Sequence, residues 1–280
     1  MKPAAFDMRR PTSLEDALSL LAGEPDSRVI AGGQSLVPMM NLRIVAPALL
    51  VDLNGIESLA GITVHGDKLR IGAMTRQHLL LGHELVSRHA PLLGRAMPHV
   101  GHVQTRNRGT VGGSLAHADP SAELPLVMVT LDAVMHARSH DSSRAIAARE
   151  FFQDVLTTCL EPGEILTHVE IPLAPPGTRA CFIEFARRHG DFAIASCAMQ
   201  FLPGTSKLQA GLGGISSTPY RCAALETALA SCGFARDKIG EAIEHELSSA
   251  RPMKDLQADA TLRLQLARTA LTRCLTEILP

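Results

Sequence analysis

The sequence has 280 residues, 46% of them hydrophobic, and a formal net charge of −1. This length and apolar content can bury a large core in two or three compact units, which excludes an intrinsically disordered chain. The near-neutral charge gives no reason to expect nucleic acid or an anionic membrane surface as a partner. No segment approaches the ~18 apolar residues of a membrane span, and the N-terminus lacks a signal-peptide core, so we expect a cytoplasmic protein.

The six cysteines and twelve histidines give no metal-binding pattern. No pair of cysteines has C-x-x-C spacing, which predicts reduced, mostly buried thiols and no iron–sulfur cluster within this chain. The closest histidine pair, His99 and His102, has no third ligand nearby in the sequence. We therefore expect no metal ion bound by this chain.

The first residues predict a small α/β unit. A helix begins at Thr12, where residues 12–15 have capping-box spacing, and it ends at Gly23. Strands are predicted at Arg28–Ile30 and Leu49–Leu53, with a helix-like stretch at Pro38–Ile44 between them.

A second α/β unit begins with a hairpin signal. Residues 62–73 alternate between apolar and polar on either side of Gly66-Asp67. Residues 75–99 are rich in helix signals, with a new helix at Pro91. After a polar and glycine-rich stretch, we predict a helix at Ala122–Thr130 and a strand at Ala133–Ala137.

The Pro-rich segment Pro172–Gly177 is the best candidate for a linker between domains. Beyond it, alternation and turn signals predict a three-stranded antiparallel sheet from Cys181–Ala186, Ala193–Leu202 and Lys207–Ile215. Apolar spacing of three and four residues predicts helices that cover one face of this sheet, giving an α+β unit. These helices are Ala223–Ala230, Arg236–Leu247 and Asp259–Leu279.

Two short segments each combine a glycine pair with a hydroxyl residue. They are Ala31-Gly32-Gly33-Gln34-Ser35 and Thr110-Val111-Gly112-Gly113-Ser114. Glycine permits positive φ and close backbone approach, so the amides of such loops can converge on an anion. Two such loops suggest a ligand with two phosphates, although the first segment alone could be an ordinary tight turn. G-x-G-x-x-G, P-loop, H-E-x-x-H and G-x-S-x-G motifs are absent from the sequence.

Five motifs occur in an order that resembles a known family. They are AGGQS at 31–35, RNRGTVGGSLAHADPSAE at 106–123, EILTHVEIP at 164–172, ARRHGDFA at 186–193 and GLGGISSTPYR at 211–221. The ordered set resembles the FAD-binding subunit of the xanthine dehydrogenase family of molybdenum hydroxylases. Within that family it is most similar to the medium subunits of three-subunit bacterial enzymes, and the resemblance covers nearly the whole chain.

The resemblance implies an α+β fold with two domains. Residues 1–173 would form an FAD-binding domain of the PCMH type, with subdomains at about 1–56 and 57–173. Residues 178–280 would form a C-terminal α+β domain with a three-stranded antiparallel sheet and helices.

The resemblance also implies which residues meet FAD. The pyrophosphate would lie against the two glycine segments, that is, against Ala31, Gly32, Gly33, Gln34, Ser35 and the following Leu36, and against Thr110, Gly112, Gly113 and Ser114. Glu123 would accept hydrogen bonds from ribitol or ribose hydroxyls, or else be a solvated acid in the first turn of a helix.

Three further positions are implied to lie near the flavin ring. Leu166 would pack on the ring, Gly101 would precede the loop that passes it, and either residue could simply belong to the core. Phe192 stands where relatives often carry Tyr, so that stacking could survive without the hydroxyl.

The implied function is that of an electron-transfer subunit. Electrons would come from [2Fe-2S] clusters of a small partner subunit, and FAD would pass them to an external acceptor. A large partner subunit with the molybdenum cofactor would oxidise the substrate, an N-heteroaromatic compound, in a dimer of heterotrimers, so we expect no substrate-hydroxylating residue here.

Two alternatives remain open. The first is a stand-alone FAD oxidase or reductase, for which His117 is a candidate for bonding to flavin. The second is a scaffold that has lost FAD, although the intact glycine segments argue against it.

Overall fold

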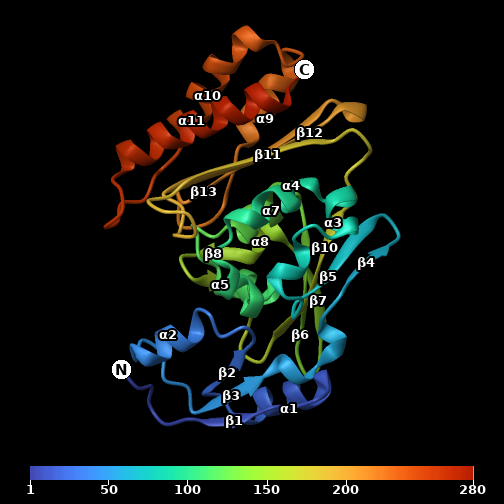
Figure 1. The fold of residues 1–280 in the computed structure, drawn as a ribbon, viewed down its shortest axis with the longest axis vertical. Coiled ribbons are helices and arrows are strands. Elements are labelled where there is room, and N and C mark those ends of the chain that lie inside the picture. The colour runs from blue at the N-terminus through green and yellow to red at the C-terminus, as the bar shows by residue number, and fades with distance from the viewer. Residues whose placement is uncertain (280) are drawn as a thin grey trace.

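The computed structural model describes residues 1–279, which form three layers along the long axis of the molecule (Figure 1). We call them the N-terminal, middle and C-terminal units. The first two units meet where Glu15 pairs with Arg138 at 3.1 Å and where Ile165 is buried in the N-terminal core. The last two meet where helices α4 (Pro91–Ala96) and α7 (Glu123–Thr130) pack on the C-terminal sheet (Figure 1). Among the described residues, no helix has both the length and the apolar character needed to cross a membrane.

The N-terminal unit is a three-stranded parallel sheet in the order β1-β3-β2. Helix α1 starts one residue later than the capping box suggested, because the Ser13 hydroxyl rather than Thr12 caps it, accepting from the Asp16 amide at 3.1 Å. The first strand was not predicted, since its three residues are all exposed and show no alternation. The elements are β1 (Asp7–Arg9), α1 (Leu14–Gly23), β2 (Ser27–Ile30), α2 (Leu36–Asn41), β3 (Leu49–Asp52), η1 (Leu53–Gly55) and η2 (Glu57–Leu59).

The middle unit is an antiparallel sheet with helices on one face (Figure 1). Its order is β4-β5-β10-β6-β7, and the predicted hairpin around Gly66-Asp67 joins β4 to β5. The sheet consists of β4 (Ile62–His65), β5 (Lys68–Gly72), β6 (Val134–Arg138), β7 (Ser143–Ala147) and β10 (Ile165–Pro172). The other elements are η3 (Gln77–Leu80), α3 (Glu84–His89), α4 (Pro91–Ala96), η4 (Met97–His99), α5 (Val103–Arg108), α6 (Val111–His117), α7 (Glu123–Thr130), α8 (Ala148–Phe151), β8 (Phe152–Asp154) and β9 (Thr157–Thr158).

Strand β10 changes the face that its side chains present, because it contains a β-bulge. Leu166 pairs with Ala137 of β6, whereas His168 pairs with the next residue back, His136, so Thr167 is the extra residue. Leu166 therefore joins the core under the helices, while Ile165 is buried in the core of the N-terminal unit. One strand thus serves two hydrophobic cores.

The C-terminal unit contains the three predicted strands and a fourth, β14, which is only two residues long. The strands are antiparallel, and the last three helices cover the face turned away from the middle unit (Figure 1). The elements are β11 (Arg179–Phe185), β12 (Ala195–Leu202), η5 (Pro203–Thr205), β13 (Lys207–Gly213), β14 (Tyr220–Arg221), α9 (Ala223–Ser231), η6 (Arg236–Lys238), α10 (Ile239–Ser248) and α11 (Ala260–Ile278).

All six cysteines are free thiols, as predicted. Four of them, Cys181, Cys197, Cys222 and Cys274, are buried in the C-terminal unit.

Candidate cofactor site

The first glycine segment follows β2 and leaves a run of backbone amides free. Gly33 has a φ of +70°, a conformation that glycine adopts without strain. Within residues 1–279, the N–H groups of residues 32–35 donate no hydrogen bond, although Gly32 is buried. Successive free N–H groups at a turn form a positively polarised concavity that suits phosphate oxygens. We call residues 32–35 the amide cradle.

The second glycine segment is the start of helix α6 rather than a loop. The amides of residues 111 and 112 donate to the carbonyls of Thr75 and Ala73, at 3.0 and 2.8 Å. The amides of residues 113 and 114 bond to the hydroxyl and carbonyl oxygens of Thr110, which is the N-cap. The interpretation of this segment as a loop of inward-turned free amides is therefore wrong, because a capped helix already uses them.

Glycine is needed at residues 112 and 113 for space rather than for positive φ. A Cβ on Gly112 would lie 2.5 Å from the Cβ of Ala73, at the end of β5. A Cβ on Gly113 would lie 2.7 Å from the hydroxyl oxygen of Thr110. The glycine pair therefore lets α6 approach the sheet closely.

The two glycine segments touch each other although about eighty residues separate them. A Cβ on Gly32 would lie 2.4 Å from the carbonyl oxygen of Arg108, and the Cβ of Ala31 lies 3.7 Å from where a Gly113 Cβ would be. The Arg76 guanidinium bridges the segments, because it donates both to the Arg108 carbonyl and to the side chain of Asn54. The Asn54 amide in turn donates to the Ala31 carbonyl at 2.8 Å.

Glu123 is the first residue of α7, and only 8% of it is exposed. Its pKa is raised to about 7, mainly by burial and also by the nearby Asp119, while a backbone hydrogen bond and Arg106 oppose the shift. The alternative of a solvated acid in a first helical turn is therefore wrong. A buried carboxyl with a pKa this high needs either a proton or hydrogen-bond donors.

A second acid, the half-buried Glu184 on β11, lies close enough to interact with Glu123. Burial raises the pKa of Glu184 to about 8, and the Glu123 carboxylate adds to the shift. Its Oε2 atom is buried and receives no hydrogen bond from any described residue. A ligand with several hydroxyl groups would supply donors to this atom. Sequence reasoning missed Glu184, which is 61 positions from Glu123 and matches no motif.

Gly101 and Arg106 lie where the middle unit meets the C-terminal unit. Gly101 has a φ of +46°, and Arg106 donates to the carbonyls of Val100 and Gly101 at 2.7 and 2.9 Å. The neighbouring His102 packs on the turn at Gly190, where a Cβ would lie 2.4 Å from its ring. The segment that carries Phe192 is thereby joined to the Gly101 turn.

The remaining predicted residues have different surroundings. Leu166 is 6% exposed and belongs to the core of the middle unit, whereas Phe192 is 51% exposed on the segment before β12. His117 is the last residue of α6, and burial lowers its pKa. The positions of Leu166 and Phe192 beside a flavin stay predictions.

Comparisons with known proteins agree on one family. Residues 4–174 match the FAD binding domain in molybdopterin dehydrogenase, and residues 180–278 match the CO dehydrogenase flavoprotein C-terminal domain. The chain is 39% identical to the 6-hydroxypseudooxynicotine dehydrogenase complex subunit alpha of Paenarthrobacter nicotinovorans, with 100% of this chain and 96% of that subunit aligned.

Two solved structures have the same fold along almost the whole chain. A chain of carbon monoxide dehydrogenase from Hydrogenophaga pseudoflava superposes with a TM-score of 0.94 at 31% identity, covering 99% of this chain and 98% of that one. A chain of quinoline 2-oxidoreductase from Pseudomonas putida 86 gives a TM-score of 0.92 at 35% identity, covering 99% and 97%. The chain therefore belongs to the FAD-binding medium subunits of the molybdenum hydroxylases, in the xanthine dehydrogenase family.

Proposed function

We propose that this subunit carries electrons from [2Fe-2S] clusters of a small partner subunit to an external acceptor. FAD, when bound, supplies the redox chemistry, and the protein supplies its position and electrostatic surroundings. The observation that supports the proposal best is the amide cradle at residues 32–35, which lies against the start of α6 and offers free donors to an anion.

We assign the pyrophosphate to the amide cradle and its neighbours. Ala31 and Leu36 flank the cradle, and the hydroxyls of Thr110 and Ser114 lie on the helix that touches it. The close packing at Gly112 and Gly113 positions those hydroxyls. This differs from the symmetric arrangement expected from the sequence, since only one of the two segments offers free backbone donors.

We assign the sugar hydroxyls of FAD to the acids Glu123 and Glu184. We assign the flavin ring to the boundary of the middle and C-terminal units. Glu123 would accept from the hydroxyls, and Glu184 extends the same acidic environment. Gly101, Leu166 and Phe192 would border the ring, with the Gly190 turn holding the segment of Phe192 in place. We also propose that the domains divide at the linker, giving 1–173 and 178–280.

For the assembly, we propose a dimer of heterotrimers with a large molybdenum subunit and a small iron–sulfur subunit. The substrate, oxidised in the large subunit, would be an N-heteroaromatic compound. The 35% identity to a chain of quinoline 2-oxidoreductase supports this class. It would bind outside this chain.

The test is purification of the native protein without an affinity tag, followed by spectroscopy and mass analysis. We expect a flavin spectrum, FAD released on denaturation, and two co-purifying subunits that contain molybdenum and iron–sulfur clusters. A solitary chain that turns over a reductant and an acceptor at ordinary enzymatic rates would instead establish a stand-alone flavin enzyme. A colourless chain that cannot be reconstituted with FAD would refute the proposal.

A further inference from the structure

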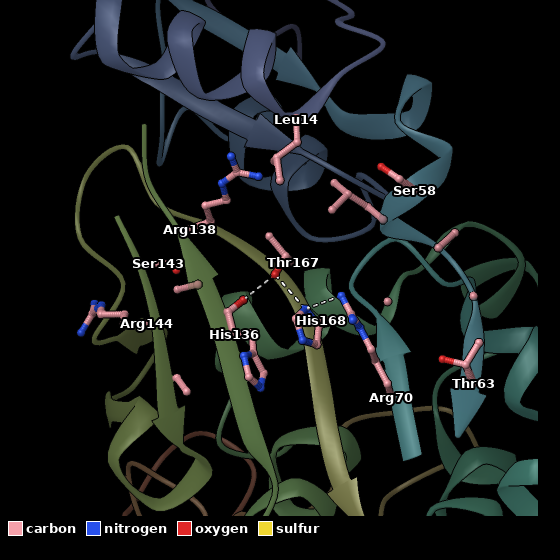
Figure 2. Close-up of a pocket in the computed structure, with 16 residues that line it drawn as sticks. Leu14, Ser58, Thr63, Arg70, His136, Arg138, Ser143, Arg144, Thr167 and His168 are labelled. Carbon is pink, nitrogen blue, oxygen red and sulfur yellow. Dashed lines mark hydrogen bonds between the residues drawn. The ribbon is translucent and has the colours of Figure 1, made fainter. Parts of the chain in front are cut away.

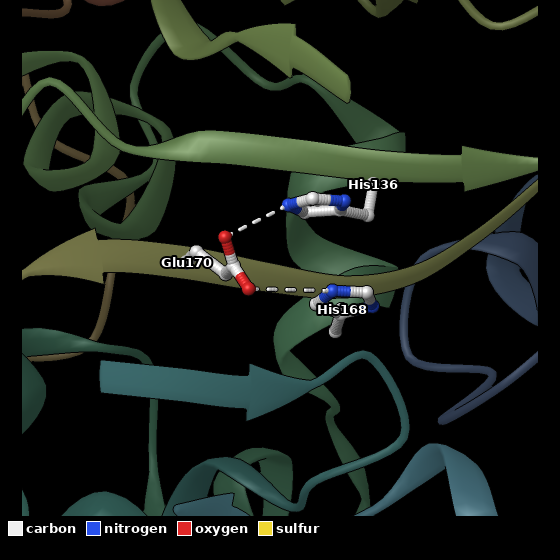
Figure 3. A group of neighbouring side chains, drawn as sticks. All are labelled: His136, His168 and Glu170. Carbon is white, nitrogen blue, oxygen red and sulfur yellow. Dashed lines mark ion pairs between the residues drawn. The ribbon is translucent and has the colours of Figure 1, made fainter. Parts of the chain in front are cut away.

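The middle sheet has a polar outer face, opposite the face that the helices cover. Side chains alternate along its strands, so Met135 and Val169 are buried under the helices while their neighbours point outward. On β6 and β10 the outward residues include His136, His168 and Glu170 (Figure 3). The bulge at Thr167 brings His168 directly opposite His136.

These three side chains are close together and partly shielded from solvent. Glu170 lies 3.1 Å from Nε2 of His136 and 3.9 Å from Nε2 of His168, and the side chains are 13–26% exposed. The two imidazoles stack with ring centroids 4.1 Å apart, and both point their Nε2 edge toward the carboxylate (Figure 3). Three potential ligand atoms lie within 4.8 Å of one another.

The other nitrogen of His168, Nδ1, lies near two groups, and one of them, the Thr167 hydroxyl, favours a free Nε2. The Thr167 hydroxyl donates to the His136 carbonyl at 3.0 Å, so its lone pairs face Nδ1 of His168, also at 3.0 Å (Figure 2). A proton on Nδ1 would leave the Nε2 lone pair available to a cation.

Two cations compete for the same groups. Lys68 donates to Glu170 at 3.3 Å, and Arg70 lies 3.3 Å from Nδ1 of His168. The Lys68 side chain is 39% exposed, so its ammonium can move into solvent when a cation of higher charge takes its place. Arg70 only donates, so it competes with an Nδ1 proton on His168, and metal binding requires its guanidinium to turn away into the adjoining cavity while Nδ1 donates to the Thr167 hydroxyl.

A cavity of about 710 Å³ adjoins the cluster, between the N-terminal unit and the outer face of the sheet (Figure 2). His136 and His168 both belong to its lining, and none of the cradle residues 32–35 does. The cavity gives small ions and water a route to the histidines that is separate from the cofactor site.

We propose that His136, His168 and Glu170 bind one divalent transition-metal ion, with Zn²⁺ as the best match. Two imidazole nitrogens and one carboxylate oxygen are a common zinc ligand set, leaving a fourth position for water. Zinc bonds to such ligands at about 2.0–2.2 Å, so small side-chain rotations would bring the three atoms to a common centre. The ion would join β6 to β10. No metal was expected, because the closest histidine pair in the sequence, His99 and His102, has no third ligand nearby; His136 and His168 are 32 positions apart and come together only in the sheet.

The experiment measures zinc binding to the full-length chain without a polyhistidine tag. The metal-stripped protein is dialysed against micromolar Zn²⁺ at pH 7.5, and bound zinc is counted by mass spectrometry. We expect close to one zinc per chain in the wild type and at least a tenfold weaker affinity in His136→Asn, His168→Asn and Glu170→Gln. The control is His140→Asn, an exposed histidine paired with Asp141 on the next turn, which should bind zinc like the wild type.

Thermal melting and circular dichroism confirm that each variant is folded, and Glu170→Gln nearly preserves the shape of the side chain. Zinc should raise the melting temperature of the wild type and not that of Glu170→Gln, since a ligand stabilises only the state that binds it. Equal zinc binding by the wild type and the three variants would overturn the proposal, as would no binding by the wild type. Neither outcome would bear on FAD binding.

Discussion

Residues 31–35 and residues 110–114 each place a glycine pair beside a hydroxyl residue, but their backbones differ. In the first segment Gly33 has positive φ and four successive amides lack a partner among the described residues. In the second, both glycines lie in the first turn of a helix whose amides are already bonded. Similar sequences thus have different structural roles: the first segment exposes backbone donors, and the second allows a helix to pack closely on the sheet.

This contrast predicts that substitutions in the two segments will fail in different ways. Changes in the first segment should reduce flavin binding with little loss of stability. Changes in the second should act through the packing of α6, unless they place a charge toward the ligand.

The largest effect is expected for Gly113→Asp. The added side chain would meet the Thr110 hydroxyl and place a negative charge beside the proposed pyrophosphate site. We expect FAD affinity to fall by roughly 100-fold or more, which corresponds to about 3 kcal/mol. Flavin content after gel filtration measures it. Gly113→Asn separates bulk from charge and should lose less, and full flavin retention by the Asp variant would refute the placement of the pyrophosphate.

The second effect is a dependence of stability on pH that comes from Glu123. Its pKa is about 7 in the folded chain, against 4.5 for an ordinary glutamate, so the folded state holds the proton more tightly. Its contribution is therefore most favourable below pH 4.5 and is lost as pH rises through 7. The loss is roughly 3 kcal/mol.

Urea unfolding of the flavin-free chain between pH 5 and 8 measures this slope. Glu123→Gln should reduce the slope, of which a part remains because the pKa of Glu184 is also raised, to about 8. Glu84→Gln, at an exposed acid in the first turn of α3, should leave the slope unchanged. An unchanged slope in Glu123→Gln would show that the carboxyl is not the source. No acid lies within residues 31–35, so the first segment should contribute nothing to this dependence.

A third effect tests the packing role of the second segment. Gly112→Ala places a Cβ 2.5 Å from that of Ala73, and overpacking of this kind costs about 2 kcal/mol, or roughly 5 °C in melting temperature. The control is Gly240→Ala in α10, where a Cβ meets nothing within 4 Å. It should leave the melting temperature unchanged or slightly higher. Equal melting temperatures for the two variants would remove the distinction between the segments.

The smallest effect on stability is expected for Gly33→Ala. Positive φ costs a residue with a Cβ about 1 kcal/mol. Gly66→Ala, in the hairpin turn with a φ of +61°, should lose similar stability and serves as the control. Only Gly33→Ala should also weaken FAD binding, which titration of the flavin-free chain with FAD measures. If both variants bind FAD equally well, the amide cradle is not the binding surface.

Most of the fold follows from local sequence patterns. The hairpin at residues 62–73 has clear alternation and a strong turn, and the helices of the C-terminal unit have apolar spacing of three and four. Elements that the sequence missed were short, such as β1 and β14, whose pairing depends on neighbouring strands rather than on their own residues. Helix α6 was missed because its two glycines have low helix propensity and a close contact with Ala73 compensates for them.

The parts of the candidate site that consist of a single stretch of sequence could be predicted. The glycine pairs and Glu123 stand out along the chain, but the burial of Glu123 and its interaction with Glu184 arise only when α7 meets β11. The histidine cluster on the outer face likewise depends on the register between β6 and β10. No periodicity within either strand reveals which residues face each other across it.

The bulge at Thr167 limits which mutations β10 can tolerate. The bulge reverses which residues of β10 point to the helix-covered face: even-numbered residues do so before it and odd-numbered residues after it. Ile165 can therefore pack in the N-terminal unit, while His168 and Glu170 face outward. Deleting Thr167 would leave Val169 and Ile171 in the core but would exchange the faces of the residues before it. Leu166 would turn outward and Ile165 would turn under the helices. Substitutions before and after the bulge should therefore be tolerated independently of each other. An insertion or deletion in β10 should not be tolerated, because it would turn buried side chains to the opposite face of the sheet.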